Sequence, residues 1–279
     1  MNTSTLSAPL AAPELDTDAL AHKALMQRRL WRTRQMPALG VFVLLFGWWA
    51  IVVGFNVKPF IAPSPILVLE TLYAKRAVLL DNMIPTALEA AGGFLLGNLV
   101  AIVMATIFVH NKTMHEIFFP VALIFNAIPV VAKAPVLVLI MGNGVEPKIA
   151  IAALVCFFPT LVNMVRGLDA ANPQALELMR VLSASKTEVF FKLRLFSSLP
   201  YLFSALRIAA SMSVIGAVVG EWIGSTRGIG ALILQATYNF DSALLYSAIT
   251  MSAFLSGSFF LVIALLERVV VRWQPPQGH

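Results

Sequence analysis

The chain of 279 residues is 59% hydrophobic and only 12% charged, and its formal net charge is +6. Soluble domains are closer to half apolar and a quarter charged, so this composition predicts a bundle of membrane spans without a sizeable soluble domain. The single cysteine, Cys156, excludes an internal disulfide and has no metal or redox spacing around it, which favours a small packed core residue.

Six apolar runs predict six membrane spans. The first follows an N-terminal tail, residues 1–36, that ends in a basic cluster. It resembles a signal peptide, but the run is too long, starts too late and has no A-x-A-like site after it, so we expect an uncleaved span. The predicted spans cover about 37–55, 84–109, 117–141, 149–165, 200–220 and 244–266. They lie in a membrane domain of residues 37–272, followed by a short C-terminal tail, 273–279.

The distribution of basic residues predicts the orientation of these spans. Thirteen of the 20 Lys and Arg residues fall in the tails and loops on the side of the two termini, and five fall on the opposite side. Cytoplasmic segments of membrane proteins carry such an excess, so we expect both termini in the cytoplasm. The same dispersion offers no patch for nucleic acid.

Small residues predict close helix packing in two of the spans. Span two carries the pair Gly93-x-x-x-Gly97, and span five carries small residues at four-residue spacing. Such patterns let helix backbones approach closely, either within one subunit or across a dimer axis. In span five these residues are Ala205, Ala209, Ser213 and Ala217, with Gly216 and Gly220 as a second pair. Before span two, Ser64-Pro65 predicts the start of a short interfacial helix.

Span three is the candidate for lining a pathway, because its prolines remove backbone hydrogen bonds and favour kinks. The prolines are Pro120, Pro129 and Pro135. The same span contains Lys133, and an ionisable group within a span is by default a functional hypothesis. Asn126 and Lys133 would share a helical face, so Lys133 could attract an anionic substrate. The alternative is a lysine that snorkels or pairs with a carbonyl freed by a proline.

A charged stretch at 172–196 separates spans four and five. Asn172-Pro173 predicts a helix over 173–182, and the capping box Ser185-x-x-Glu188 predicts a second over 186–195. We expect Ser197 and Ser198 to interrupt the chain before span five. These short helices form either an interfacial amphipathic loop or a docking element for a soluble partner.

The residues of this stretch resemble the permease subunits of bacterial ABC importers, in the nitrate/sulfonate/taurine branch. The family loop reads E-A-A-x-x-x-G-x9-I-x-L-P; here Glu177-Leu178-Met179 stands in the E-A-A place and Ser183 in the glycine place. The segment from Leu199 to Arg207 is similar to LP-x-x-x-x-G-L-R, and VVGEWIGSTRGIGALI at 218–233 is similar to V-x-x-E-x-x-G-x-x-G-L-G-x-x-I. The resemblance covers roughly residues 40–272.

The resemblance implies an all-α, six-span permease whose cytoplasmic two-helix loop couples to an ATPase. It implies these coupling residues: Glu177, Leu178, Met179, Leu182, Ser183, Ala184 and Ser185. Pathway candidates are Asn126, Pro129 and Lys133, while Arg207 and Glu221 are gate or structural residues, and Glu89 is expected at the membrane interface. The implied partners are cytoplasmic ABC ATPase subunits, an extracytoplasmic solute-binding protein, a second permease copy and the lipid bilayer of the bacterial inner membrane.

The chain itself is not expected to be an enzyme. It lacks the G-x-x-x-x-G-K-[ST] loop that binds ATP, and its four histidines show no ligand spacing, so we expect neither a cofactor nor a metal. The branch implies a small anionic solute such as nitrate, a sulfonate or taurine; related permeases serve pyrimidine precursors of thiamine. Met179, Ser183, Phe196 and Lys133 depart from the family pattern. These departures leave open a degenerate or scaffold subunit that docks an ATPase without transporting, and a stand-alone secondary transporter is a third alternative.

Overall fold

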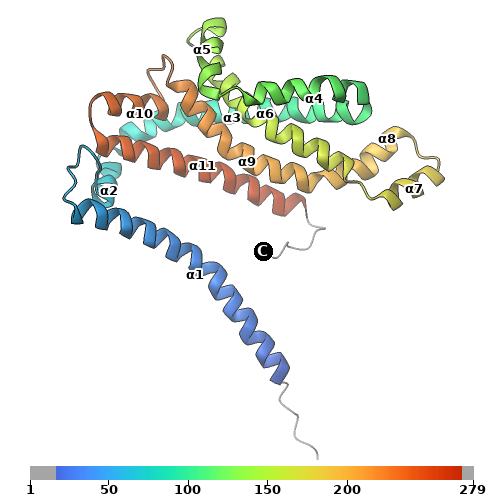
Figure 1. The fold of residues 1–279 in the computed structure, drawn as a ribbon, viewed down its shortest axis with the longest axis horizontal. Coiled ribbons are helices and arrows are strands. Elements are labelled where there is room, and N and C mark those ends of the chain that lie inside the picture. Colours follow the sequence, from blue (N-terminus) through green and yellow to red (C-terminus); the bar gives the residue numbers. More distant parts are fainter. Residues whose placement is uncertain (1–16, 272–279) are drawn as a thin grey trace, which may run out of the picture. The chain divides into compact units, whose positions relative to one another are not determined.

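The computed structural model describes residues 17–271, and this part of the chain contains helices, turns and loops but no strand (Figure 1). The helices are α1 (Thr17–Gly54), α2 (Pro65–Ala74), α3 (Arg76–His110), α4 (Lys112–Ala127), α5 (Val130–Met141), α6 (Glu146–Asp169), α7 (Pro173–Val181), α8 (Lys186–Val189), the π-helix η1 (Phe190–Arg194), α9 (Leu195–Glu221), α10 (Ile229–Tyr238) and α11 (Ser242–Val270).

The chain divides into two compact units, residues 1–57 and 58–279. The first unit holds α1, whose apolar part, Ala38–Gly54, coincides with the first predicted span. The helix already begins at Thr17, so part of the predicted N-terminal tail is helical. The rest of that tail and the predicted C-terminal tail, 273–279, lie outside the described residues.

The second unit contains four helices long and apolar enough to cross a membrane: α3, α6, the run from Lys186 to Glu221, and α11. The bent pair formed by α4 and α5 is a fifth candidate. These helices lie where the sequence predicts spans two to six. An all-α polytopic membrane fold is therefore confirmed.

Glycines let α3 and α9 approach α6 closely, as the small-residue patterns predict. A Cβ added at Gly97 of α3 would lie 2.9 Å from the Cα of Ala153, and one added at Gly216 of α9 would lie 2.7 Å from the Cα of Ala152. Both distances are too short for real carbon atoms. The small-residue seam of span five therefore packs within the subunit, against α6.

The predicted third span is two helices and not one kinked helix. α4 and α5 meet at an angle of 101° around Ile128 and Pro129. Pro129 has no N–H to continue α4, and its carbonyl accepts the first backbone bond of α5, from the N–H of Ala132 at 3.0 Å. A backbone break is therefore present at Pro129, whereas Pro120 and Pro135 lie inside α4 and α5; the pair is a broken span or a re-entrant loop.

The two predicted serines do not interrupt the chain before span five. The run from Lys186 through η1 to Glu221 is continuously helical over 36 residues. The Ser198 hydroxyl donates to the carbonyl of Leu195 at 2.8 Å, so its hydrogen bond is made within the same helix. Its small side chain also packs closely against Gly167 of α6.

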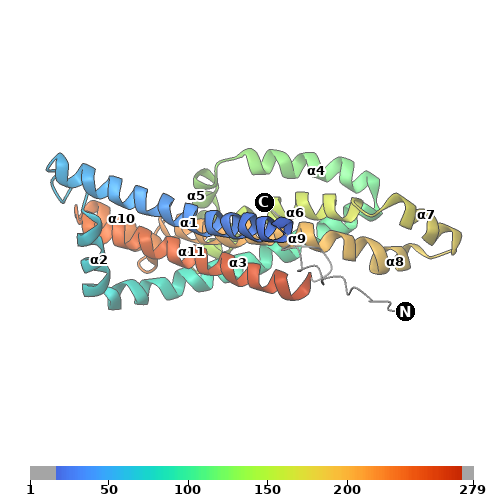
Figure 2. The same cartoon turned by 90° about the horizontal axis from the view of Figure 1, so that it is seen from below.

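The short helices occupy the two ends of the second unit. α2 and α10 lie at one end, and α7 and α8 lie at the other, beyond the ends of α6 and α9 (Figures 1 and 2). Ser64 caps α2 as predicted, with its hydroxyl accepting from the N–H of Leu67 at 3.2 Å. The predicted coupling residues and the predicted outer loops are therefore separated by the length of the long helices.

Candidate functional site

Local sequence builds the two-helix loop almost as predicted. Asn172 caps α7, with its side-chain oxygen accepting from the N–H of Gln174 at 2.8 Å. The capping box is also confirmed: Ser185 accepts from the N–H of Glu188, and the Glu188 carboxylate accepts from the N–H of Ser185 at 3.0 Å. These caps fix where the two helices begin.

Ser183 forms the turn between the helices in a left-handed conformation, with φ at 54°. The Ala184 N–H donates to the Met179 carbonyl and the Ser183 N–H to the Arg180 carbonyl, each at 3.0 Å, which is the Schellman pattern of helix termination. This is the position where the family pattern has glycine. Serine thus keeps the turn, at a modest cost in backbone strain.

The first helix of the loop presents an apolar face to its surroundings. Leu178, Val181 and Leu182 are 60%, 81% and 67% exposed, and none of the nine residues of α7 is buried. Glu177 is exposed beside them. An apolar face of this kind is suited to contact with another surface.

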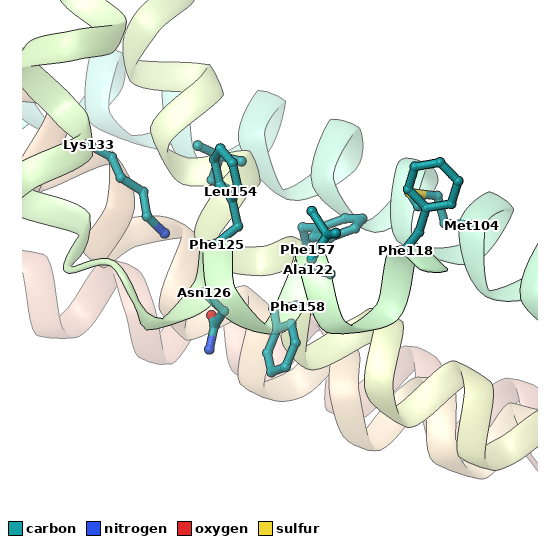
Figure 3. Close-up of a pocket in the computed structure, with 10 residues that line it drawn as sticks. Met104, Phe118, Ala122, Phe125, Asn126, Lys133, Leu154, Phe157 and Phe158 are labelled. Carbon is teal, nitrogen blue, oxygen red and sulfur yellow. The ribbon is translucent and has the colours of Figure 1, made fainter. Parts of the chain in front are cut away.

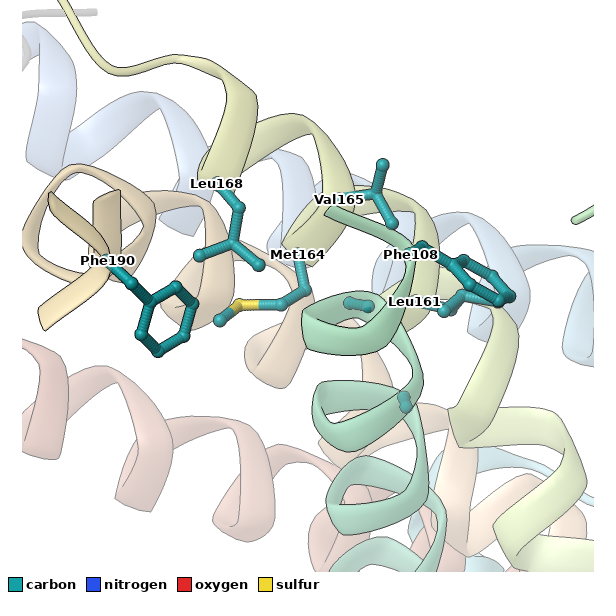
Figure 4. Packing of buried hydrophobic residues seen from close by; sticks show 8 residues of the cluster. Phe108, Leu161, Met164, Val165, Leu168 and Phe190 are labelled. Atoms are coloured by element: carbon teal, nitrogen blue, oxygen red, sulfur yellow. The ribbon is translucent and has the colours of Figure 1, made fainter. Parts of the chain in front are cut away.

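The second helix of the loop, α8, is held against α3 and α6 by Phe190, the residue that follows it. This side chain is buried and packs with Leu168 and Met164 of α6 in the cluster that also holds Phe108 of α3 (Figure 4). The Phe190 ring lies 5.0 Å from that of His110 at the end of α3. Arg194 adds an ion pair to Asp169, the last residue of α6, at 3.2 Å. The loop is thereby held by both α3 and α6.

A cavity of about 200 Å³ lies between α3, α4, α5 and α6 (Figure 3). Four phenylalanines line it together with one amide and one lysine. The lining residues are Met104, Phe118, Val121, Ala122, Phe125, Asn126, Lys133, Leu154, Phe157 and Phe158. The cavity is thus mainly aromatic, with two polar side chains.

Asn126 and Lys133 meet at this cavity, but not for the predicted reason. They cannot share a helical face, because the break at Pro129 places Asn126 on α4 and Lys133 on α5. Figure 3 shows the Lys133 side chain extending from α5 toward the end of α4 that carries Phe125 and Asn126. Among the described residues, no carboxylate pairs with Lys133 and no carbonyl accepts a hydrogen bond from it.

At the opposite end, Glu221 is fully buried. Its carboxylate accepts from the Thr86 hydroxyl and from the N–H of Gly230, each at 2.6 Å. Gly228, with φ at 119°, passes so close that a Cβ there would lie 2.6 Å from Oε2 of Glu221. Glu221 therefore holds the loop that follows α9 against α3.

The sequence predicted Glu89 at the membrane interface, and this is wrong. Glu89 is buried inside the protein, beside Glu221. Lys148 of α6 lies 3.1 Å from its Oε1 and also donates to the hydroxyl of Ser225 at 2.9 Å. The sequence does contain a signal for this pair: an acid, Glu89, and a base, Lys148, lie near the same end of two apolar segments. Arg207 pairs with Glu267 of α11 at 3.2 Å and does not meet Glu221.

Comparisons with known proteins agree with this architecture. Residues 97–274 match the family profile described as "Binding-protein-dependent transport system inner membrane component". The chain is 30% identical over 237 residues to the formylaminopyrimidine transport permease protein ThiX of Halalkalibacterium halodurans, covering 85% of this chain and 95% of that protein. It is 31% identical over 251 residues to the riboflavin transport system permease protein RibX of Chloroflexus aurantiacus, covering 89% and 93%.

A further similar protein is the taurine transport system permease protein TauC of Escherichia coli, 27% identical over 274 residues, which cover 91% of this chain and 97% of that protein. The profile spans more than half of the chain, and the relatives are covered almost end to end. The chain therefore belongs to the binding-protein-dependent transport system inner membrane components, the multi-pass inner-membrane permease subunits of ABC importers.

Proposed function

We propose that this permease carries a small planar nitrogen heterocycle, of the pyrimidine class, into the cell. The observation that supports this most is the cavity between α3, α4, α5 and α6. Its lining includes four phenylalanines together with Asn126 and Lys133. Aromatic side chains stack on a planar ring, and an amide with an ammonium group can hydrogen-bond the polar edge of that ring. The relatives named for formylaminopyrimidine and riboflavin transport point to the same chemistry.

A small anion such as nitrate, a sulfonate or taurine is the second candidate. The ammonium group of Lys133 favours it, since this group has no carboxylate partner among the described residues. The aromatic lining disfavours it, because a compact anion would lose its hydration without gaining enough polar partners. Within the described part of the chain, Lys133 and Asn126 are the only polar side chains that line this cavity.

We propose that α7 delivers the energy for transport. Its exposed face, Leu178, Val181 and Leu182, would lie in a cleft of a cytoplasmic ATPase, with Glu177 and the turn Ser183–Ser185 beside it. This assigns the loop and both termini to the cytoplasm, as the basic residues predict. A solute-binding protein would dock on the opposite side, and a second copy of the chain would complete the pathway along α4 and α5, where only Ala134 is buried.

The degenerate or scaffold alternative rests on the departures from the family pattern. Ser183 keeps the Schellman turn, and Phe196 lies within an unbroken helical run. Neither departure disturbs the loop, which favours a working coupling element over a degenerate one. A secondary transporter would need no docking face on α7 and would take up solute without ATP.

Uptake into proteoliposomes tests the transport proposal. The permease is reconstituted with its cognate ATPase and binding protein, and uptake of a radiolabelled aminopyrimidine is compared with that of taurine. We expect ATP-dependent uptake of the pyrimidine, reduced about tenfold or more by Phe157→Ala combined with Phe158→Ala. Lys133→Leu should impair taurine uptake far more than pyrimidine uptake if the second candidate is right. Uptake of neither solute, with ATPase bound, would support the scaffold alternative.

Retention of the ATPase tests the coupling proposal separately. Tagged wild type should retain the ATPase in a pull-down, and Glu177→Arg or deletion of residues 176–190 should abolish retention. Lys192→Ala is the matched control, because Lys192 lies in the same loop but outside α7. Equal retention by all four proteins would refute the assignment of α7 as the docking helix.

A further inference from the structure

A second cavity, of about 370 Å³, lies beneath the two-helix loop and is lined by basic side chains. The end of α3, the outer part of α7, and α8 with η1 form its walls. The lining residues are Val109, His110, Leu176, Arg180, Ala184, Lys186, Val189, Phe190 and Arg194. No acidic residue belongs to this lining, so the cavity is suited to an anion.

Two of its cations are not neutralised. Arg194 pairs with Asp169 at 3.2 Å, but neither Arg180 nor Lys186 has an ion-pair partner among the described residues. The nearby acid Glu188 is already engaged by Lys192 at 3.0 Å and by the Ser185 N–H. The cavity therefore has two cations, Arg180 and Lys186, that no ion pair among the described residues neutralises.

The end of α3 contributes the imidazole ring of His110, whose orientation is fixed. His110 is the last residue of α3, and its Nδ1 lies 2.8 Å from the Thr106 carbonyl. A carbonyl can only accept, so Nδ1 carries a proton, and in the neutral ring Nε2 is then an acceptor that offers no donor to a phosphate oxygen. The ring is held against Phe190 at 5.0 Å, which keeps it at the edge of the cavity.

We propose that this cavity binds a phosphate group, and specifically the headgroup phosphate of an anionic phospholipid of the cytoplasmic leaflet. The proposal rests on the cytoplasmic placement of the loop proposed above. Guanidinium and ammonium groups bind phosphate oxygens with charge-assisted hydrogen bonds. Basic pockets beside membrane helices on the cytoplasmic side are suited to lipid headgroups.

The position of the cavity favours lipid over free phosphate. α3 is a candidate membrane span and ends at His110, so the cavity lies where that helix leaves the bilayer. Ile107, one turn earlier on the face of His110, is exposed and apolar, and so is Phe191 of η1. A lipid whose phosphate lies among the basic residues could therefore lay its chains against apolar side chains.

A bound phosphate would connect the two helices of the loop, because Arg180 is on α7 and Lys186 is on α8. The Ser183 turn is the only covalent link between the two loop helices, so a ligand held by Arg180 and Lys186 would brace that turn. An anionic lipid would thus set the angle at which α7 is presented.

Lipid binding to the purified full-length protein tests the proposal without any transport step. Native mass spectrometry in detergent would measure phosphatidylglycerol binding to wild type and to Arg180→Ala combined with Lys186→Ala. Each basic residue near an anionic surface contributes about 1 kcal/mol, so the double variant should bind roughly thirtyfold more weakly. Arg166→Ala combined with Lys192→Ala removes the same charge outside the cavity and should bind like wild type. Arg180→Lys combined with Lys186→Arg should restore binding.

Four results would overturn the proposal. Equal binding by the cavity variant and the control variant would show that net charge alone attracts the lipid. Equal retention of phosphatidylcholine would remove the requirement for an anionic headgroup. Displacement of the lipid by millimolar inorganic phosphate would assign the site to free phosphate, and displacement by the ATPase would assign it to an acidic side chain of that partner.

Discussion

Lys148 of α6 and Glu89 of α3 form a buried ion pair, with Nζ 3.1 Å from Oε1 and side chains that are 10% and 2% exposed. The carboxyl group of Glu221 lies directly beside this pair. Lys148 thus pairs with one of the two buried acids and also donates to Ser225 in the loop that follows α9. Removing one member of a buried pair leaves a charge without compensation, which is far more costly than replacing both.

Lys148→Met should therefore lower the free energy of unfolding by about 3–5 kcal/mol. The double variant Lys148→Met with Glu89→Gln should be more stable than Lys148→Met alone, because the stranded carboxylate is gone. Thermal unfolding of the detergent-solubilised protein measures both. Lys112→Met, which breaks the exposed Lys112–Glu116 pair, is the control and should change nothing measurable. Strictly additive losses in the double variant would contradict the coupling of these groups.

The contact between α3 and α6 should not tolerate a single added methyl group. Gly97→Ala would place its Cβ 2.9 Å from the Cα of Ala153, and backbone cannot move aside cheaply. Overpacking of this kind costs about 1–3 kcal/mol. Gly257→Ala on α11 is the matched control, because nothing lies within 4 Å of an added Cβ there. Its midpoint of thermal unfolding should stay the same or rise slightly, since alanine favours helix. An equal drop in both variants would refute the close approach.

Glycine at position 183 should stabilise the left-handed turn between α7 and α8. Ser183→Gly removes a side chain from a residue with φ at 54° and should relieve about 1 kcal/mol of strain. Ser183→Val should have the opposite effect, because a β-branched residue is strongly disfavoured there. Hydrogen exchange of the amides at 183 and 184, which close the Schellman motif, reports the local change. Faster exchange in Ser183→Gly than in Ser183→Val would contradict the observed conformation.

Acid should weaken the junction between α2 and α11. The hydrogen bond from Lys75 at 2.7 Å, followed by the N–H of Leu244, holds the pKa of Asp241 below its ordinary value of 3.8. A carboxyl group with a lowered folded-state pKa contributes stability that is complete above its unfolded pKa and is lost as pH falls through the folded one. Wild type should therefore lose more stability than Asp241→Asn as pH is lowered below about 4. Parallel stability curves for the two proteins from pH 6 to pH 2 would refute this contribution.

Features encoded by neighbouring residues could be predicted from the sequence. The caps at Ser64, Asn172 and Ser185 depend on side chains two or three residues from the N–H that they bind, so their motifs were sufficient. The family's glycine at the place of Ser183 is consistent with the left-handed turn that the structure has there. Gly97 predicted close packing correctly, but only the fold identifies Ala153 as the residue that it meets.

Features that depend on helix rotation or direction could not be predicted. Glu89 and Lys148 are 59 positions apart, and their pairing requires that α3 and α6 turn these two faces toward each other. The prolines of span three indicated a kink, but whether Pro129 produces a small bend or one of 101° depends on the packing of α5. Ser198 was read as a helix breaker, since a serine that bonds back to its own helix cannot be distinguished from sequence alone.

The helical run from Lys186 to Glu221 connects the two ends of the second unit without a break. Its 36 residues reach about 50 Å, with the box of Ser185 and Glu188 at one tip and the buried carboxylate of Glu221 at the other. A tilt of about 5° around its middle would displace each tip by roughly 2 Å, in opposite directions. That displacement is larger than the stretch available to the Thr86 and Gly230 hydrogen bonds, which are 2.6 Å long and would be lost beyond roughly 3.5 Å. Because the run is helical throughout, a displacement of its Ser185 end would also displace its Glu221 end.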